Sequence, residues 1–354
     1  MKAIIFILLI FSANVVFCES SPKNVMIFMA ADNSLEDFSY RDLDEINNSL
    51  PLNSIDLNIE VHRKNESFEL SYEISSSKKV PIKRHRDISK NLDEFIKRNL
   101  KKDAPNILIL WGHGQGPKSE YSTREFGGIF TNSDNYSALS TQKLGEILRK
   151  FPISILIFDM CLMQNLKVIT QLESGPEIII GSAQIQNLIG LPYSDMMYLI
   201  DQEDDLRYLS SKIVDTAQNN MPNANFTFSA IYTQQSRYIL DSLSSLNRDL
   251  KELLRTDPIK HFVYSTYFND LPQFPGNYYD IGMYLGILKK IDLENEMFPP
   301  KIKNKISKVQ DNINSSLINK TFGPHYIDGT APYYVEFFQG LSLTKDQMAL
   351  PKFD

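Results

Sequence analysis

Two apolar runs, each ending in a reactive residue, constrain the fold of this chain most strongly. Residues 107–111 lead directly into Gly112-His113-Gly114, and residues 153–158 lead into Asp159-Met160-Cys161. A short continuous apolar run is typical of a strand that is buried on both faces of a parallel sheet. Ligands of such sheets bind beyond the carboxyl ends of the strands. The two runs therefore predict a Cys/His site at one edge of a parallel sheet.

Strand and helix patterns alternate along most of the chain. We expect strands at residues 24–31, 55–61, 68–74, 106–111, 153–159, 177–181 and 226–232, and a late strand pair within 333–343. We expect helices at residues 34–46, 88–100, 140–150, 162–172, 206–217, 279–291 and 301–317. This alternation predicts an α/β protein with a mostly parallel central sheet flanked by helices. Near Pro258 the alternating strand and helix patterns give way to mainly helical ones. We therefore expect one α/β domain, residues 24–257, and a mainly helical C-terminal extension, residues 258–354, packed on it.

The N-terminus has the layout of a secretory signal, with Lys2, an apolar run over residues 3–11 and a polar segment after Cys18. We expect residues 1–18 to be a signal peptide and the mature protein to be secreted, at the cell surface or periplasmic. A lipid anchor on Cys18 is the alternative, which Phe17 disfavours because lipidation usually requires a small residue before the cysteine. No later segment approaches the ~20 apolar residues of a membrane-spanning helix.

The charge of the chain argues against a nucleic-acid partner. The formal net charge is −6, whereas proteins that bind phosphate backbones carry clustered Lys and Arg. The one basic stretch, residues 78–86, is short and is expected to be a solvated strand or loop.

Cysteine and histidine usage sharpens the prediction of a site. Without Cys18, Cys161 is the only thiol of the chain and cannot form an intrachain disulfide. A free cysteine is most often a small buried hydrophobic residue, but Cys161 stands at a strand-to-helix junction, where ligands bind. His113 occupies the equivalent position on its own run. The other histidines are expected to be structural or solvated: His62, His85, His261 and His325. No second His or Cys has ligand spacing to His113, so no metal site is predicted.

A neighbouring imidazole would make Cys161 a nucleophile. A free cysteine with a pKa of about 8.5 is only about 3% thiolate at pH 7. His113 would raise the reactive fraction and protonate a leaving amine, while the N–H groups of Gly114 and Cys161 would form an oxyanion hole. Asp159 is expected to orient the nucleophile turn or the pocket floor; the alternative is a helix N-terminal acid.

These motifs resemble the clostripain family of cysteine peptidases, within the caspase, legumain and gingipain superfamily. The matching stretches are residues 25–36, 111–116, 158–163, 181–182, 190–193 and 279–281. The spacing from His113 to Cys161 is similar to the ~50 residues between the corresponding residues of caspases. The resemblance implies a caspase-like sandwich, endopeptidase activity on protein or peptide substrates, and His113 and Cys161 as the catalytic dyad. It requires no cofactor, although calcium affects some members. Self-processing in the loop after the histidine would use Lys118 or Arg124.

The resemblance also places Trp111, Ser182, Ile189 and Gly190 at the substrate pocket. Family members typically cleave after Arg or Lys, with acidic residues before the segment that corresponds to residues 190–193. Here residues 181–193 contain no carboxylate, and Ile189 stands where an acid is expected. An apolar or polar preference is therefore an alternative to a basic one. Asp195 would supply a charge only if the loop shifted.

Three functions follow from these observations. The leading prediction is an exported cysteine endopeptidase, supported by both strand-end motifs. A surface binding protein that retains the peptidase fold without activity would explain the missing acid. A transpeptidase or ligase would use the same thioester chemistry.

Overall fold

The computed structural model describes residues 22–73, 76–117, 128–131, 138–220, 226–269, 271–322 and 338–349. The expected signal peptide with Cys18, and the residues Lys118 and Arg124, lie outside these ranges. The strands of the main sheet are β1 (Lys23–Ala30), β2 (Ile55–His62), β3 (Ser67–Glu73), β4 (Ser76–Pro81), β5 (Asn106–Trp111), β6 (Ile155–Asp159), β7 (Ile178–Gly181), β8 (Thr227–Tyr232) and β10 (Leu317–Phe322). Their order is β10-β8-β7-β6-β5-β1-β2-β3-β4. A separate antiparallel pair joins β9 (Tyr278–Asp280) and β11 (Ser342–Thr344).

The centre of the sheet is parallel, as the sequence predicts. Strands β7, β6, β5, β1 and β2 all run in one direction, and every residue of β1, β5 and β6 is buried. Burial on both faces explains why these strands are continuous apolar runs. Both edges are antiparallel, with β3 and β4 at one and β8 and β10 at the other.

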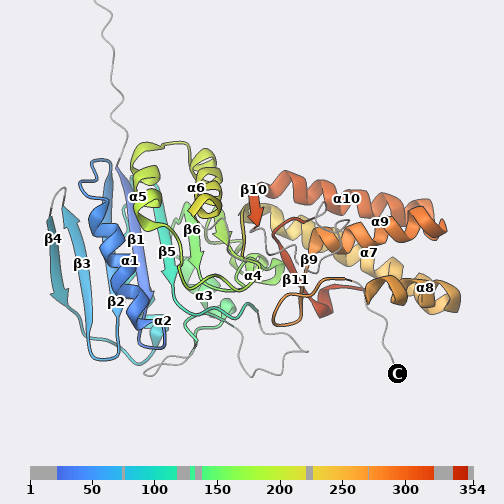
Figure 1. The fold of residues 1–354 in the computed structure, drawn as a ribbon, viewed down its shortest axis with the longest axis horizontal. Coiled ribbons are helices and arrows are strands. Elements are labelled where there is room, and N and C mark those ends of the chain that lie inside the picture. Colours follow the sequence, from blue (N-terminus) through green and yellow to red (C-terminus); the bar gives the residue numbers. More distant parts are fainter. Residues whose placement is uncertain are drawn as a thin grey trace, which may run out of the picture.

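Helices cover both faces of the sheet. They are α1 (Glu36–Asn48), α2 (Ile88–Asn99), α3 (Thr141–Leu148), α4 (Leu166–Leu172), α5 (Tyr193–Gln202), α6 (Leu206–Asn220), α7 (Ser236–Thr256), α8 (Pro258–Phe268), α9 (Ile281–Asn295) and α10 (Pro300–Ser316). One apolar core lies between the sheet and α1, α5 and α6, and the other lies on the face of α2, α3 and α4 (Figure 1). The two helices that separate β7 from β8, α5 and α6, both pack on one face of the sheet. After this pair of helices, the chain enters β8 antiparallel to β7.

A lobe of helices α7 to α10 lies beside the β10 edge of the sheet (Figure 1). The lobe begins at Ser236, ahead of Pro258, where the sequence pattern becomes mainly helical. It shares an apolar core with α4 and the sheet. After α10 the chain returns to the sheet as β10, which pairs with β8. The lobe is therefore an insertion between two neighbouring strands.

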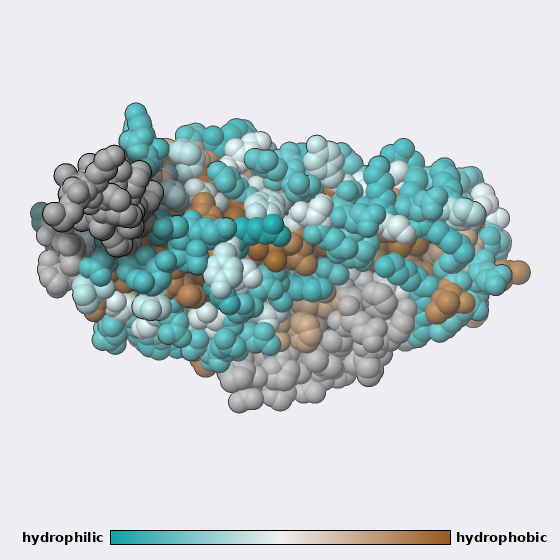
Figure 2. All heavy atoms as spheres, turned by 90° about the horizontal axis from the view of Figure 1, so that it is seen from above, coloured by the Kyte–Doolittle hydropathy of each residue, from teal (hydrophilic) through white to brown (hydrophobic). Residues whose placement is uncertain are grey.

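The surface seen from the side of α5, α6 and α10 is mostly hydrophilic, and apolar residues appear on it singly or in small groups (Figure 2). Such a surface is ordinary for helices that face solvent. In the described part of the chain, no helix is both long and apolar enough to cross a membrane.

Candidate active site

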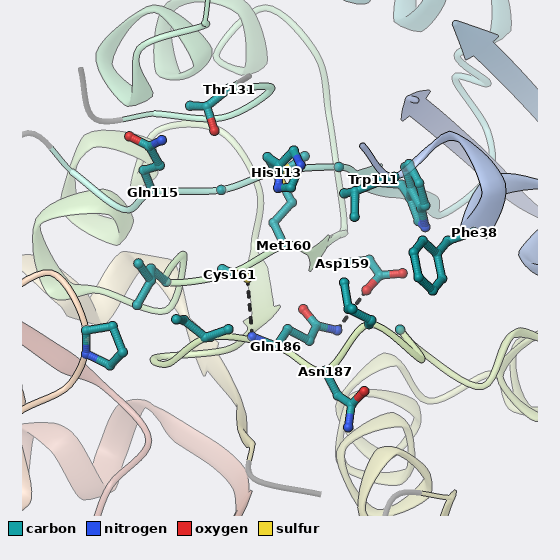
Figure 3. Close-up of a pocket in the computed structure, with 18 of the residues that line it drawn as sticks. Phe38, Trp111, His113, Gln115, Thr131, Asp159, Met160, Cys161, Gln186 and Asn187 are labelled. Carbon is teal, nitrogen blue, oxygen red and sulfur yellow. Dashed lines mark hydrogen bonds between the residues drawn. The ribbon is translucent and has the colours of Figure 1, made fainter. Parts of the chain in front are cut away.

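The register of β5 and β6 brings the two reactive strand ends together. Trp111, the last residue of β5, pairs with Asp159, the last residue of β6. His113 and Cys161 each follow two residues later, and both line one cavity of about 330 Å³ at the carboxyl edge of the sheet (Figure 3). Strand pairing alone therefore places an imidazole and a thiol at the same cavity.

Cys161 begins a turn that precedes α4. The expected helix over residues 162–172 starts only at Leu166, because the Asn165 side chain caps it by accepting a hydrogen bond from the Lys167 N–H. Leu162 has a φ of 66°, in the left-handed region that residues other than glycine rarely adopt. Strain of this kind is often found at functional sites, where surrounding contacts hold it in place.

Hydrogen bonds from both directions join this turn to the segment that follows β7. The Leu162 N–H donates to the Gln184 carbonyl at 3.0 Å. The Gln186 N–H in turn donates to Cys161 Sγ at 3.3 Å, as Figure 3 shows. Ser182 is 1% exposed and donates to the Gln184 carbonyl at 2.9 Å, so it shapes the segment rather than lining the cavity.

Gly114 lies so close to the turn that carries Cys161 that a side chain would not fit at its position. A Cβ atom at this position would lie 2.4 Å from the Cys161 carbonyl oxygen and 2.9 Å from Met160 Cβ. Only glycine fits so close to another backbone. This packing brings the backbone after His113 directly against Cys161.

His113 is half-buried, and its Nε2 lies 3.0 Å from Ser34 Oγ. Burial lowers the pKa of His113, which favours the neutral imidazole at neutral pH. Ser34 lies between β1 and α1, where the sequence pattern indicated only the start of a helix. Because Ser34 follows the end of β1, it lies at the same edge of the sheet as His113. This position in the sequence could have indicated a contact with the histidine.

The surroundings of the Cys161 thiol also favour its neutral form. Burial raises the pKa of Cys161 and the nearby Asp159 adds to this, while the Gln186 N–H opposes it by stabilising the thiolate. Both shifts favour the neutral forms, and a neutral imidazole is the form of His113 that can accept a proton.

Asp159 lies in the wall of the cavity and is only 7% exposed. Its Oδ1 accepts a hydrogen bond from Gln186 Nε2 at 2.7 Å, and its Oδ2 accepts one from the Tyr193 hydroxyl at 3.0 Å (Figure 3 shows the first). Burial, together with the charge of Asp42, raises the pKa of Asp159 to about 7. The carboxyl therefore titrates near neutrality, and it is held in place by Gln186, Tyr193 and the Leu191 N–H.

A second carboxylate, Asp42 of α1, lines the same cavity. It is 1% exposed; its Oδ2 accepts from Trp111 Nε1 at 2.8 Å and its Oδ1 accepts from Arg41 Nη2 at 2.8 Å. Burial raises the pKa of Asp42. We call Asp42, Trp111 and Asp159 the acidic wall. Its Asp42 carboxylate comes from α1 and not from residues 181–193, where the family resemblance implied an acid.

Gly190 keeps the acidic wall open. Its φ is 69°, and a Cβ atom there would lie 3.4 Å from Asp159 Oδ2 and 3.6 Å from Asp42 Oδ2. Glycine therefore lets the backbone pass close to both carboxylates without a side chain between them.

The profile of the clostripain family, peptidase family C11, matches residues 27–339. This chain belongs to the clostripain family. It is thus a member of a family of cysteine peptidases. Comparison with curated protein sequences gives no match.

Solved structures of C11 proteases share the fold of this clostripain-family chain. An inactive zymogen from Parabacteroides distasonis has a TM-score of 0.63 and 18% identity, covering 92% of each chain. A secreted C11 cysteine protease from Bacteroides thetaiotaomicron, bound to an irreversible peptide inhibitor, has a TM-score of 0.65 and 18% identity, covering 91% of this chain and 92% of its own. Another structure from that organism, called iotapain, has a TM-score of 0.67 and 16% identity, covering 93% and 95%. The caspase-like α/β architecture is therefore shared.

The remaining positions expected at the pocket of this clostripain-family chain are divided between two cavities. Trp111 lines the cavity of Cys161, and Gly190 lines both this cavity and the neighbouring one. Ile189 is 55% exposed and lines a separate cavity with Glu45 and Asp195. Within the described residues, no group of three or more His, Cys, Asp or Glu side chains is arranged to hold a metal ion.

Proposed function

We propose that this chain is an exported cysteine endopeptidase that cleaves after basic residues. The observation that carries the proposal is the convergence of Cys161, His113 and the acidic wall on one cavity. Family membership supports peptidase chemistry. The peptide inhibitor bound to the Bacteroides thetaiotaomicron relative supports a peptide substrate.

In the proposed reaction, Cys161 Sγ attacks the carbonyl carbon of the scissile bond while its proton passes to His113. The oxyanion accepts hydrogen bonds from the N–H groups of Gly114 and Cys161, two residues that pack against each other. The C–N bond then breaks, and the proton moves from His113 to the leaving amine. Water, deprotonated by His113, attacks the thioester, and Cys161 regains its proton as the acid product leaves.

The acidic wall supports a cationic side chain before the scissile bond, at the position called P1. Both oxygens of Asp42 already accept hydrogen bonds from Trp111 and Arg41, and the Arg41 guanidinium forms an ion pair with it, so Asp42 has a supporting role in the wall. Asp159 is the carboxyl whose charge responds to the substrate, because an approaching cation lowers the pKa of a buried acid. Gln186 Oε1 is buried with no hydrogen-bond partner in the described chain and can accept a further bond. The pocket thus offers mainly acceptors, which suits the donors of Lys or Arg.

A peptide library tests this function, with the mature protein compared with Cys161→Ala. We expect wild-type cleavage after Lys or Arg and none by the variant. Cleavage mainly after apolar residues would overturn the basic preference alone. Products joined to added amines would indicate a transpeptidase or ligase. An absence of turnover with either protein would indicate a binding protein.

Export is part of the proposal and has its own test. The N-terminal signal layout supports it, and one structural relative is described as a secreted protease. N-terminal sequencing of the protein recovered outside the producing cell should begin after residue 18. A retained, uncleaved N-terminus would contradict secretion without affecting the peptidase proposal.

A further inference from the structure

The cavity extends past Cys161 on the side away from the acidic wall. In Figure 3, Phe38, Trp111 and Asp159 lie on one side of Cys161, and Gln115 and Thr131 lie on the other. A substrate chain that crosses the thiol must therefore contact this second side as well.

Apolar side chains line the second side. Leu162, Ile185 and Pro275 all belong to the cavity, and we call them the Ile185 wall. A Cβ atom on Gly116, next to Gln115, would lie 2.9 Å from the Leu162 carbonyl oxygen, which places Leu162 near the Gln115 side. Ile185 follows Gln184, whose carbonyl accepts the Leu162 N–H.

The lobe contributes Pro275 through a segment anchored to the loop after His113. The Tyr278 hydroxyl donates to the carbonyls of Gln115 and Pro117 at 3.0 and 2.9 Å. The neighbouring Gly276 lies against the Tyr278 ring and also lines the cavity. These contacts hold the segment with Pro275 beside the site.

Ile185 leaves apolar surface uncovered at the mouth of the cavity. Its side chain is 50% exposed, although it lies next to the proposed reaction centre. Covering such a surface with an aliphatic group removes apolar area from water and is favourable. The chemistry of this side therefore matches an aliphatic side chain rather than a charged one.

Thr131 provides an independent sign that this side receives a ligand. It is 3% exposed, and its Oγ1 has no hydrogen-bond partner among the residues that the structure describes. Buried hydroxyl groups normally have a partner. A peptide backbone bound along this side could supply it with an N–H or C=O group.

We propose that the Ile185 wall binds the residue directly after the scissile bond, P1′, and that this residue is preferably aliphatic. The inference depends on the proposed peptidase function and on the acidic wall binding P1. The scissile carbonyl carbon bonds to Cys161 Sγ, so the P1 and P1′ side chains must lie on opposite sides of the thiol. If P1 occupies the acidic wall, P1′ meets the Ile185 wall.

Internally quenched peptides with Lys at P1 and either Leu or Gly at P1′ test the inference. We expect the wild-type protein to prefer Leu about tenfold in kcat/KM, a ratio typical of an apolar subsite. Ile185→Ser should reduce this ratio to near one. Ile189→Ser is the matched control, because Ile189 is similarly exposed at 55% but lines the other cavity, and it should keep the wild-type ratio.

A second variant keeps the inference falsifiable if Ile185→Ser is inactive. Ile185→Lys should shift the P1′ preference towards Asp or Glu, and hydrolysis of a peptidyl-lysine methyl ester, which has no P1′ residue, shows whether each variant remains an active enzyme. An unchanged Leu to Gly ratio in Ile185→Ser, or a changed preference at P2 instead, would overturn the inference and leave the peptidase proposal intact. Failure of the wild-type protein to cleave any peptide would overturn both.

Discussion

The acidic wall and the Ile185 wall face each other across Cys161 and are built in opposite ways. Asp42 and Asp159 are almost fully buried, and each of their oxygens accepts a hydrogen bond. Ile185 is half-exposed on a loop. Buried carboxylates held by several donors are positioned before substrate arrives, whereas an exposed aliphatic side chain contributes only the apolar area that a ligand covers. We therefore expect the acidic wall to determine specificity and the Ile185 wall to adjust it.

The largest effect should come from removing the thiol between the two walls. Cys161→Ala eliminates the nucleophile, and we expect kcat/KM to fall by at least ~10⁴-fold for every peptide, whatever its P1 or P1′ residue. The melting temperature should change little, because a small side chain replaces another. Single-turnover assays and thermal melts measure the two quantities. Residual activity within tenfold of wild type would contradict the assignment of Cys161.

Asp159→Asn should change the P1 preference, which we assign to the acidic wall, without changing the P1′ preference, which we assign to the Ile185 wall. The substitution preserves shape but removes the charge that faces a P1 cation, and losing a buried charge partner costs about 3–4 kcal/mol, or ~10²–10³-fold in kcat/KM for Lys at P1. Peptides with Gln at P1 should lose far less, and the Leu to Gly ratio at P1′ should stay at its wild-type value. Equal losses for Lys and Gln peptides would show that Asp159 acts through the fold rather than through charge.

The pH dependence of specificity should follow Asp159. Its pKa is raised to about 7, so the carboxyl is neutral below that pH and negatively charged above it. The ratio of kcat/KM for Lys to that for Gln at P1 should therefore rise between pH 6 and pH 8, by about tenfold. Because both substrates use Cys161 and His113, the titrations of those groups cancel in the ratio. Asp159→Asn should give a flat ratio, and a rise that persists in this variant would point to another acid.

The smallest effect should come from Ser34. Ser34→Ala removes the partner of His113 Nε2 and frees the ring to reorient, so we expect kcat/KM to fall by about threefold to tenfold. Ser34→Thr keeps the hydroxyl and should restore most of the activity. The pH–rate profile should shift in Ser34→Ala but not in Ser34→Thr. If Thr is no better than Ala, packing rather than the hydrogen bond positions the imidazole.

The sequence predicts the centre of the sheet and the two reactive strand ends because these features are local. Strands that are buried on both faces have continuous apolar sequences. The sequence therefore predicts β5 with its observed bounds, Asn106–Trp111. The edges depend on distant partners. Strand β10 pairs with β8 only after the whole helical lobe, so no local pattern reveals it.

Asp42 is the one member of the acidic wall that the sequence analysis did not predict. It lies on α1, one residue before Leu43 and four before Ile46, and the buried positions of this helix are Ser39, Asp42, Leu43 and Ile46. An acid within the apolar stripe of a helix is unusual, and this pattern could have indicated that Asp42 is a functional residue. Its meaning depends on Trp111, which contacts it through the tertiary fold rather than through the sequence.

The position of the helical lobe between β8 and β10 limits how the two sides of the cleft can move. The lobe carries Pro275 and leaves the sheet from one strand and returns by its direct neighbour. The lobe also shares an apolar core with α4 and the sheet, so swinging it away would expose apolar surface to water. Access to the leaving-group side therefore has to change through local loops. A chain cut short before β10 would lose one of these connections and expose the edge of β8.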